Sequence, residues 1–260
     1  MVRLHQAGEG WIFVSLTDIS EHTWLGKILR LPLRLIPPRM IVRVLRGRLR
    51  GMKWIAASGL HSYWLGTYES HHTTLFEKTI KEGKIVFDIG AHVGFYTLLA
   101  SLLVGPRGLV YAFEPLPGNL IYLKEHLRLN GIGNVVVVEA AVADSCGSAA
   151  FQEGGNRFMG RLCQRGDLRV KIISLDELVA QRELPVPDYL KIDVEGAEFL
   201  VLKGAEATIG EHHPTIFLSL HGSDRREQCG NFLGGFNYHL EPTDGRQLNE
   251  AAEILAYYEN

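Results

Sequence analysis

The chain has 260 residues, of which 46% are hydrophobic and 22% are charged, and its formal net charge at pH 7 is −2. This composition excludes a disordered or fibrous protein, and the length suits one main domain with an extension. The small net charge gives no global attraction to polyanions, so nucleic acid is not an expected partner, and membrane binding would need a local patch.

The beginning of the chain predicts no secretory signal, because residues 1–20 contain charges and no continuous apolar core. No stretch of the sequence is long and apolar enough to span a bilayer. Cys146, Cys163 and Cys229 are odd in number and lack the short spacing of a zinc or redox pair. We therefore expect a reducing compartment and a cytoplasmic protein.

Residues 27–53 form a basic segment, in which Lys and Arg alternate with aliphatic residues and no acid occurs. Pro32, Pro37 and Pro38 divide it, which argues against one long amphipathic helix. Two interpretations stay open. The segment is either an extension that solvates its arginines, or a surface for a membrane, a polyphosphate or an anionic substrate, which would make the protein a peripheral membrane protein. We place the extension or cap at residues 1–74 and the main domain at residues 75–260.

The apolar run 85–88 ends in Asp88 and predicts a buried parallel strand, and residues 95–104 predict a helix. Gly90 and Gly94 lie between them, where glycine allows a tight turn and close approach to a ligand. A dinucleotide would rest its pyrophosphate on the helix N-terminus, where Asp88 would repel it. The methionine ammonium of S-adenosylmethionine would be attracted instead.

Residues 109–114 predict the next strand, whose last residue, Glu114, would face the two ribose hydroxyls of a nucleoside. Glu114 lies 20 residues after Gly94 (114 − 94), which also matches the acidic residue of a nicotinamide-dependent dehydrogenase. Asp88 and the missing middle glycine of G-x-G-x-x-G disfavour the dehydrogenase. The pattern D-x-G-x-x-x-G thus favours S-adenosylmethionine.

Alternating elements continue through the rest of the chain and predict an α/β fold with a doubly wound sheet. A helix is expected over 117–130 and a strand over 135–139. An insertion is expected over 149–158, with a turn at residues 154–156, and a capping box at Ser174–Glu177 begins a further helix.

Two further strands, 189–193 and 215–220, bring Asp193 and His221 to the carboxyl edge of the sheet. Either residue could be the general base that removes a proton from an acceptor hydroxyl. Asp193, Glu195 and His221 could alternatively bind a divalent metal. Glu195 is a further catalytic candidate, and Glu198 is expected to stabilise the first turn of the next helix.

Three blocks of the sequence resemble the FkbM-type methyltransferases and occur in that family's order. They are residues 87–97 (FDIGAHVGFYT), 112–115 (AFEP) and 190–198 (LKIDVEGAE). The third block is the most specific, and the resemblance covers about residues 65–240. It implies a class I, Rossmann-like fold with a seven-stranded sheet, S-adenosylmethionine as methyl donor, and most often an oxygen acceptor on a sugar, polyketide, lipid or other secondary metabolite.

The resemblance also extends the set of cofactor-binding candidates beyond the residues already discussed. The full set is Tyr68, Glu69, Asp88, Gly90, Ala91, His92, Gly94, Tyr96, Thr97, Glu114 and Asp144. Tyr68 and Glu69 are expected to belong to a lid over the cofactor, and Asp144 is a candidate for the adenine amino group, although acids are also common in turns. His92 departs from the family, which usually has asparagine there, so its contact near the methionine end is open.

We therefore predict an O-methyltransferase that acts on a small-molecule or glycan acceptor. An N-methyltransferase stays open, although the chain lacks the Asn/Asp-Pro-Pro-Tyr/Phe signature of many amino-methylating enzymes after the strand that ends at Asp193. A non-catalytic module that binds a nucleoside or docks on an anionic surface also stays open, because a fold does not prove a function.

Overall fold

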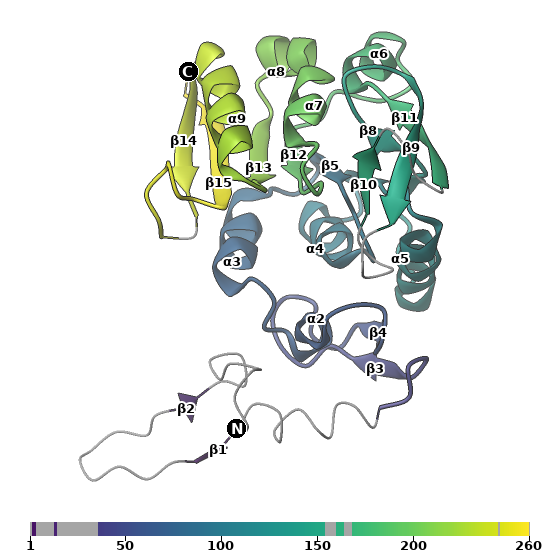
Figure 1. Cartoon of the computed structure of the whole chain (residues 1–260). Helices are drawn as coiled ribbons and strands as arrows, with labels where there is room; N and C mark the ends of the chain where they lie inside the picture. Colours follow the sequence, from purple (N-terminus) through teal and green to yellow (C-terminus); the bar gives the residue numbers. More distant parts are fainter. Residues whose placement is uncertain are drawn as a thin grey trace, which may run out of the picture. The chain divides into compact units, whose positions relative to one another are not determined.

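The computed structural model describes residues 2–3, 13–14, 36–153, 160–163, 168–243 and 245–259 (Figure 1). The chain divides into two compact units, Met1–Tyr68 and Glu69–Asn260. The domain boundary expected between residues 74 and 75 falls inside helix α3 (Ser70–Thr79) of the second unit. Within the described parts of the chain, no helix combines the length and the apolarity of a membrane span.

The described residues of the N-terminal unit form two small antiparallel pairs and a short helix. Its pairs are β1 (Val2–Arg3) with β2 (Phe13–Val14) and β3 (Ile41–Arg43) with β4 (Lys53–Ile55), and helix α2 is His61–Leu65. Trp54 of β4 is fully buried and anchors this unit, with its ring centroid 5.5 Å from that of Tyr63. Of the basic segment 27–53, residues 27–35 lie outside the described part of the chain.

The second unit is built on a seven-stranded sheet with the order β14-β15-β13-β12-β5-β6-β7. The parallel strands are β5 (Ile85–Ile89), β6 (Leu109–Phe113), β7 (Val135–Val138), β12 (Tyr189–Ile192) and β13 (Thr215–Ser219). Strand β15 (Glu253–Tyr258) runs antiparallel to β13 and to β14 (Tyr238–Pro242). The strand order reverses between β5 and β12, which is where open α/β sheets bind ligands.

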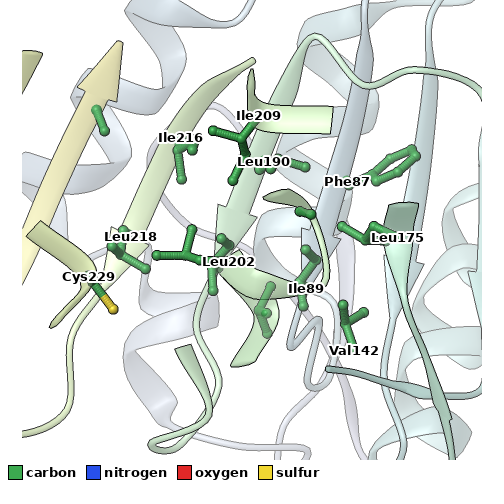
Figure 2. Packing of buried hydrophobic residues seen from close by; sticks show 14 of the residues in the cluster. Phe87, Ile89, Val142, Leu175, Leu190, Leu202, Ile209, Ile216, Leu218 and Cys229 are labelled. Atoms are coloured by element: carbon green, nitrogen blue, oxygen red, sulfur yellow. The ribbon is translucent and has the colours of Figure 1, made fainter. Parts of the chain in front are cut away.

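Helices cover both faces of this sheet because its strands are apolar on both sides. Helices α6 (Leu175–Ala180), α7 (Glu198–Lys203), α8 (Glu206–His212) and α9 (Ser223–Gly235) contribute to one buried cluster with the strands. Figure 2 shows this packing, with Leu202 of α7 and Cys229 of α9 among Leu190 and Leu218 of the sheet.

The opposite face carries the side chains that alternate with that cluster, since successive residues of a strand point to opposite sides. Phe76 of α3 packs there on Phe217 of β13 and Tyr96 of α4 (Phe95–Val104), with ring centroids 4.8 and 5.2 Å away. Helix α5 is Pro117–Asn130. Asp88 and Lys191 each lie between two strand residues of the apolar cluster. Their side chains therefore point to the opposite face, toward α3 and α4.

The predicted seven-stranded, doubly wound α/β architecture is confirmed. The predicted helices over 95–104 and 117–130 are confirmed at both ends, and the predicted strands of the central sheet agree within one residue. One of the two hydrogen bonds of the predicted capping box is confirmed, because Ser174 Oγ accepts a hydrogen bond from the Glu177 amide at 3.4 Å.

A second, four-stranded sheet with the order β10-β9-β11-β8 stands beside the main one. Its strands are β8 (Ala141–Val142), β9 (Gly147–Glu153), β10 (Gly160–Cys163) and β11 (Leu168–Ile173). The insertion expected over 149–158 thus begins in the hairpin of β9 and β10. Its expected turn at residues 154–156 lies outside the described residues.

Candidate active site

The turn between β5 and α4 packs directly against the loop that follows β12. Gly90 has a φ of 81°, and a Cβ atom built on it would lie 1.9 Å from the carbonyl oxygen of Asp193. Gly94 has a φ of 95° and begins α4. The amides of Gly90 and Ala91 both donate to the Phe113 carbonyl at 3.0 Å, which ties the turn to β6. Glycine at position 90 therefore lets two strand ends meet.

Asp88 lies at the base of this turn and is fully buried. Its Oδ2 atom accepts a hydrogen bond from Thr97 Oγ1 at 2.6 Å. Its Oδ1 atom has no hydrogen-bond partner among the described residues and lies 3.5 Å from Lys191 Nζ. Asp88 thus contributes a buried negative charge beneath the turn, with Thr97 as its donor.

Lys191 of β12 is a buried cation that joins two carboxylates. It is 3% exposed, and its Nζ atom lies 3.3 Å from Asp193 Oδ2 and 5.0 Å from the centre of the Tyr96 ring. Burial alone lowers the pKa of Lys191, but Asp193 and Asp88 outweigh it and raise that pKa. Lys191 therefore stays charged, and sequence analysis did not assign it a role.

Glu114 ends β6 and holds three parts of the chain together. Its Oε1 atom accepts from the Leu116 amide at 2.8 Å and from Asn119 Nδ2 at 3.2 Å, and its Oε2 atom accepts from the His92 amide at 2.8 Å. Burial raises the pKa of Glu114 to about 7, against the N–H donors that lower it. His92, in the left-handed region with a φ of 53°, thus contributes its backbone amide to the site.

A polar cluster lies between α3, α4 and the C-terminal strands. Tyr96 Oη donates to Glu69 Oε2 at 2.6 Å and lies 3.0 Å from His72 Nδ1, which is 3.4 Å from Glu253 Oε2. Ser219 Oγ donates to Glu253 Oε2 at 2.9 Å. Burial raises the pKa of Tyr96, and it raises the pKa of Glu253 to about 7. Glu69 is 31% exposed, so its carboxylate reaches from this cluster to solvent.

His221 follows β13 and is held by one ring nitrogen. Its Nδ1 atom lies 2.7 Å from Oε1 of Glu198, which is fully buried and also accepts from the Gly196 amide at 2.9 Å. Its Nε2 atom lies 3.9 Å from Asp193 Oδ1 and 4.0 Å from Glu195 Oε2. The Glu198 hydrogen bond, offset by burial and aided by the nearby carboxylates, raises the pKa of His221 to about 9.

The structure thus brings together most of the residues that the sequence singled out. Charges of alternating sign run from Asp88 through Lys191, Asp193 and His221 to Glu198, and each neighbouring pair is no more than 3.9 Å apart. Two members of this row, Lys191 and Glu198, were not predicted as site residues. The signal for Lys191 was a lysine inside an apolar strand, and the signal for Glu198 was its place in the third family-like block.

Two of the predicted cofactor-binding residues, Asp144 and Tyr68, do not belong to this row of charged residues. Asp144 is exposed, and its Cα atom would lie 3.3 Å from a Cβ atom built on Gly204, at the end of α7. Tyr68 belongs to the N-terminal unit, where its ring centroid lies 4.5 Å from that of Tyr63. Its role in a lid stays a prediction.

The side chains of the candidate metal ligands Asp193, Glu195 and His221 are not arranged as a metal site in this structure. Among the described residues, no group of three or more His, Cys, Asp or Glu side chains is placed to hold a metal ion. His221 uses Nδ1 for Glu198, which leaves Nε2 as the nitrogen nearest Asp193 and Glu195.

The described residues fit a nucleoside joined to a methionine. Glu114 places a carboxylate at the end of β6 for hydroxyl donors, and the partly exposed carboxylates of Glu69 and Asp193 suit an ammonium. Gly90 keeps the turn free of a side chain where the ends of β5 and β12 meet.

Comparison with known proteins agrees with this chemistry. The "Methyltransferase FkbM domain" family matches residues 88–259. Hexuronic acid methyltransferase AglP of Haloferax volcanii is 32% identical over 126 residues, which are 48% of this chain and 51% of that protein. The 31-O-demethyl-FK506 methyltransferase FkbM of Streptomyces tacrolimicus is 29% identical over 164 residues, with 49% of this chain and 61% of that protein covered.

The chain therefore matches only about half to three fifths of the length of these relatives. A crystal structure of methyltransferase FkbM from Methylobacillus flagellatus superposes with a TM-score of 0.51 at 20% identity, covering 67% of this chain and 43% of that one, and it supports the fold. The family match covers the glycine turn, Glu114, the Lys191 to Glu198 block and His221. The chain belongs to the FkbM family of S-adenosylmethionine-dependent methyltransferases.

Proposed function

We propose that the protein transfers a methyl group from S-adenosylmethionine to a hydroxyl oxygen of a small acceptor, with His221 as the general base. The observation that carries this proposal is the position of His221. Glu198 holds one of its ring nitrogens, and the other lies beside Asp193 at the carboxyl end of the switch-point strands. A base in this place can take a proton from an acceptor that enters the same crevice.

The cofactor supplies an electrophilic methyl group when it is bound. Glu114 would hold the ribose hydroxyls, and Glu69 and Asp193 would hold the methionine ammonium. Thr97 and Lys191 hold the Asp88 carboxylate beneath the turn, where it fixes the position of the Lys191 cation. These residues bind and orient, which is where much of the acceleration of a two-substrate reaction arises.

The protonation state of His221 determines the pH range in which this side chain can act as a base. A carboxylate only accepts hydrogen bonds, so Nδ1 carries a proton toward Glu198 and Nε2 is the nitrogen that gains or loses one. With a pKa of about 9, Nε2 is mostly protonated at neutral pH in the free protein. Turnover is therefore expected to rise with pH up to about 9.

The proposed acceptor class is supported by the relatives, which match about half of this chain. Their names give a hexuronic acid and a demethylated oxygen of FK506 as substrates. Both are oxygen-bearing small molecules, which supports a hydroxyl on a sugar or a polyketide as the acceptor. The thiols of Cys146 and Cys229 are free, in keeping with the proposed cytoplasmic, reducing location.

The test is an acceptor screen with isotope-labelled S-adenosylmethionine on the purified protein, with uronic acids, neutral sugars and polyketide alcohols. Substitution His221→Ala should lower turnover by a factor of about 10² to 10⁴ and leave cofactor affinity nearly unchanged. His239→Ala, at an exposed histidine of β14, is the matched control. Full turnover in His221→Ala, or methylation of amines alone, would overturn the proposal.

The metal alternative needs its own experiment. Asp193, Glu195 and His221 stay the candidate ligands, and turnover measured with a chelator and then with added Mg²⁺ or Mn²⁺ shows whether methyl transfer requires an ion.

A further inference from the structure

The two units of the chain carry opposite charges. The N-terminal unit contains 10 Lys and Arg residues and 3 Asp and Glu residues, which give it a formal charge of +7. Residues 69–260 contain 17 Lys and Arg residues and 26 Asp and Glu residues, which give a formal charge of −9. The near-neutral total therefore hides a strongly cationic unit. Its part from residue 22 to residue 68 contains no acid at all.

The hairpin of β3 and β4 turns one face inward and one outward. Val42 pairs with Trp54, which is fully buried, so this pair faces the interior of the N-terminal unit. Side chains alternate along a strand, and Ile41 and Arg43 accordingly face outward. Ile41 is 52% exposed, and Arg43 is also exposed although its Nη1 atom donates to the Gly51 carbonyl.

Residues on either side of β3 are also exposed. Met40 is 48% exposed and Leu45 is 54% exposed, so three large apolar side chains within six positions face solvent. We call the following set the hairpin surface: the exposed residues Arg39, Met40, Ile41, Arg43, Leu45, Arg46, Arg48 and Arg50.

We propose that the hairpin surface docks the protein on an anionic lipid bilayer. Its guanidinium groups match the phosphates of lipid headgroups, to which they can donate two parallel hydrogen bonds. Its aliphatic side chains can enter the interface between headgroups and acyl chains, where they lose contact with water. This short stretch of exposed residues thus offers both interactions that a peripheral membrane protein uses.

A nucleic acid or a soluble polyphosphate would interact with the charged side chains of the hairpin surface and leave its apolar side chains in water. Either polyanion would attract the arginines, but neither offers an apolar phase to Met40, Ile41 and Leu45. A bilayer also accounts for the charge difference between the units, because an anionic membrane attracts the N-terminal unit and repels the rest of the chain. This inference does not depend on methyl transfer or on the residues of the active site.

The test is sedimentation of the full chain with vesicles of phosphatidylcholine, with and without phosphatidylglycerol, at low and high salt. Binding should require phosphatidylglycerol and weaken with salt. The triple substitution Arg46→Glu, Arg48→Glu and Arg50→Glu should reduce the partition coefficient by about 100-fold or more, since each basic residue near the surface contributes a factor of about five. The pair Ile41→Ser and Leu45→Ser should reduce binding at high salt, where insertion dominates.

Matched controls separate this surface from net charge and general apolarity. The triple substitution Lys81→Glu, Lys171→Glu and Lys203→Glu changes the net charge equally at exposed sites of the second unit and should leave binding nearly intact. Ile121→Ser with Val186→Ser serves the same purpose for exposed apolar residues. Thermal unfolding and S-adenosylmethionine binding of each variant show whether it is folded. Equal loss in the control triple, no binding to vesicles, or binding to RNA or heparin alone would overturn the proposal.

Discussion

Oε1 of the buried Glu198 lies 2.7 Å from Nδ1 of His221, and this pair fixes the imidazole at the carboxyl end of β13. The hydrogen bond is the first cause of the raised pKa of His221. Arg225 lies near the other oxygen of Glu198, with its Nε atom 3.8 Å from Oε2. We therefore propose that Glu198 is a positioning residue, which would act on the proposed reaction through the protonation and orientation of His221.

Removing the charge of Glu198 should move the pH dependence of turnover. In Glu198→Gln the imidazole loses its carboxylate partner, so its pKa should fall from about 9 toward the ordinary value of 6.5. The rising limb of kcat against pH should move toward neutrality, while KM for S-adenosylmethionine changes little. Glu198→Asp should restore part of the wild-type profile. An NMR titration of the His221 ring gives the same answer without turnover, and an unchanged pKa would refute the positioning role.

The same pair should make folding stability depend on pH. The folded state holds the His221 proton more tightly than the unfolded state does, because the pKa is raised on folding. The resulting stabilisation is fully present below pH 6.5 and is lost as the pH rises through about 9. Urea unfolding at several pH values should show this decline in the wild type and a flatter curve in Glu198→Gln. Equal slopes in the two proteins would contradict the prediction.

Lys191 should matter for stability more than a surface lysine does. Substitution Lys191→Met leaves the carboxylates of Asp88 and Asp193 without their cation, one of them fully buried, and should cost about 3–5 kcal/mol of unfolding free energy. Lys84→Met breaks an exposed ion pair with Asp188 and should cost at most about 1 kcal/mol. Denaturant unfolding of both variants checks the difference. Similar costs would mean that the buried pairing contributes little.

Gly90 should not tolerate a side chain. In Gly90→Ala the new Cβ atom would collide with the backbone carbonyl of Asp193, and the φ of 81° disfavours any L-residue. The cost should be about 2–4 kcal/mol, with loss of S-adenosylmethionine binding because the ends of β5 and β12 must separate. Gly133→Ala, where a Cβ atom meets nothing within 4 Å, is the control and should be nearly neutral. A fully stable, cofactor-binding Gly90→Ala protein would contradict the packing argument.

The sequence predicts the sheet well because apolar runs and glycine turns are local signals. Carboxyl ends of parallel strands meet at one edge, so Asp88, Glu114, Asp193 and His221 could be grouped before any contact was known. The pairing of Glu198 with His221 could not be predicted. The two residues are 23 positions apart, and their contact depends on how closely α7 packs beside β13.

Burial was equally hard to predict. Asp88 sits at a strand end, where the pattern suggests an exposed ligand contact, yet Thr97 and Lys191 enclose it. The strand period places Lys191 on the same face as Asp88, but only the packed helices α3 and α4 remove that face from water. The hydrogen bond from Asn119 to Glu114 was hard to predict for a similar reason, because it depends on how the first turn of α5 packs against the end of β6.

The most direct test of the account is calorimetric titration of the purified protein with S-adenosylmethionine and, separately, with NAD, repeated with Glu114→Gln. The account predicts that the wild type binds S-adenosylmethionine and not NAD, and that the substitution weakens binding markedly because the ribose hydroxyls lose a carboxylate acceptor. Binding of NAD in place of S-adenosylmethionine, or equal affinity in Glu114→Gln, would contradict it.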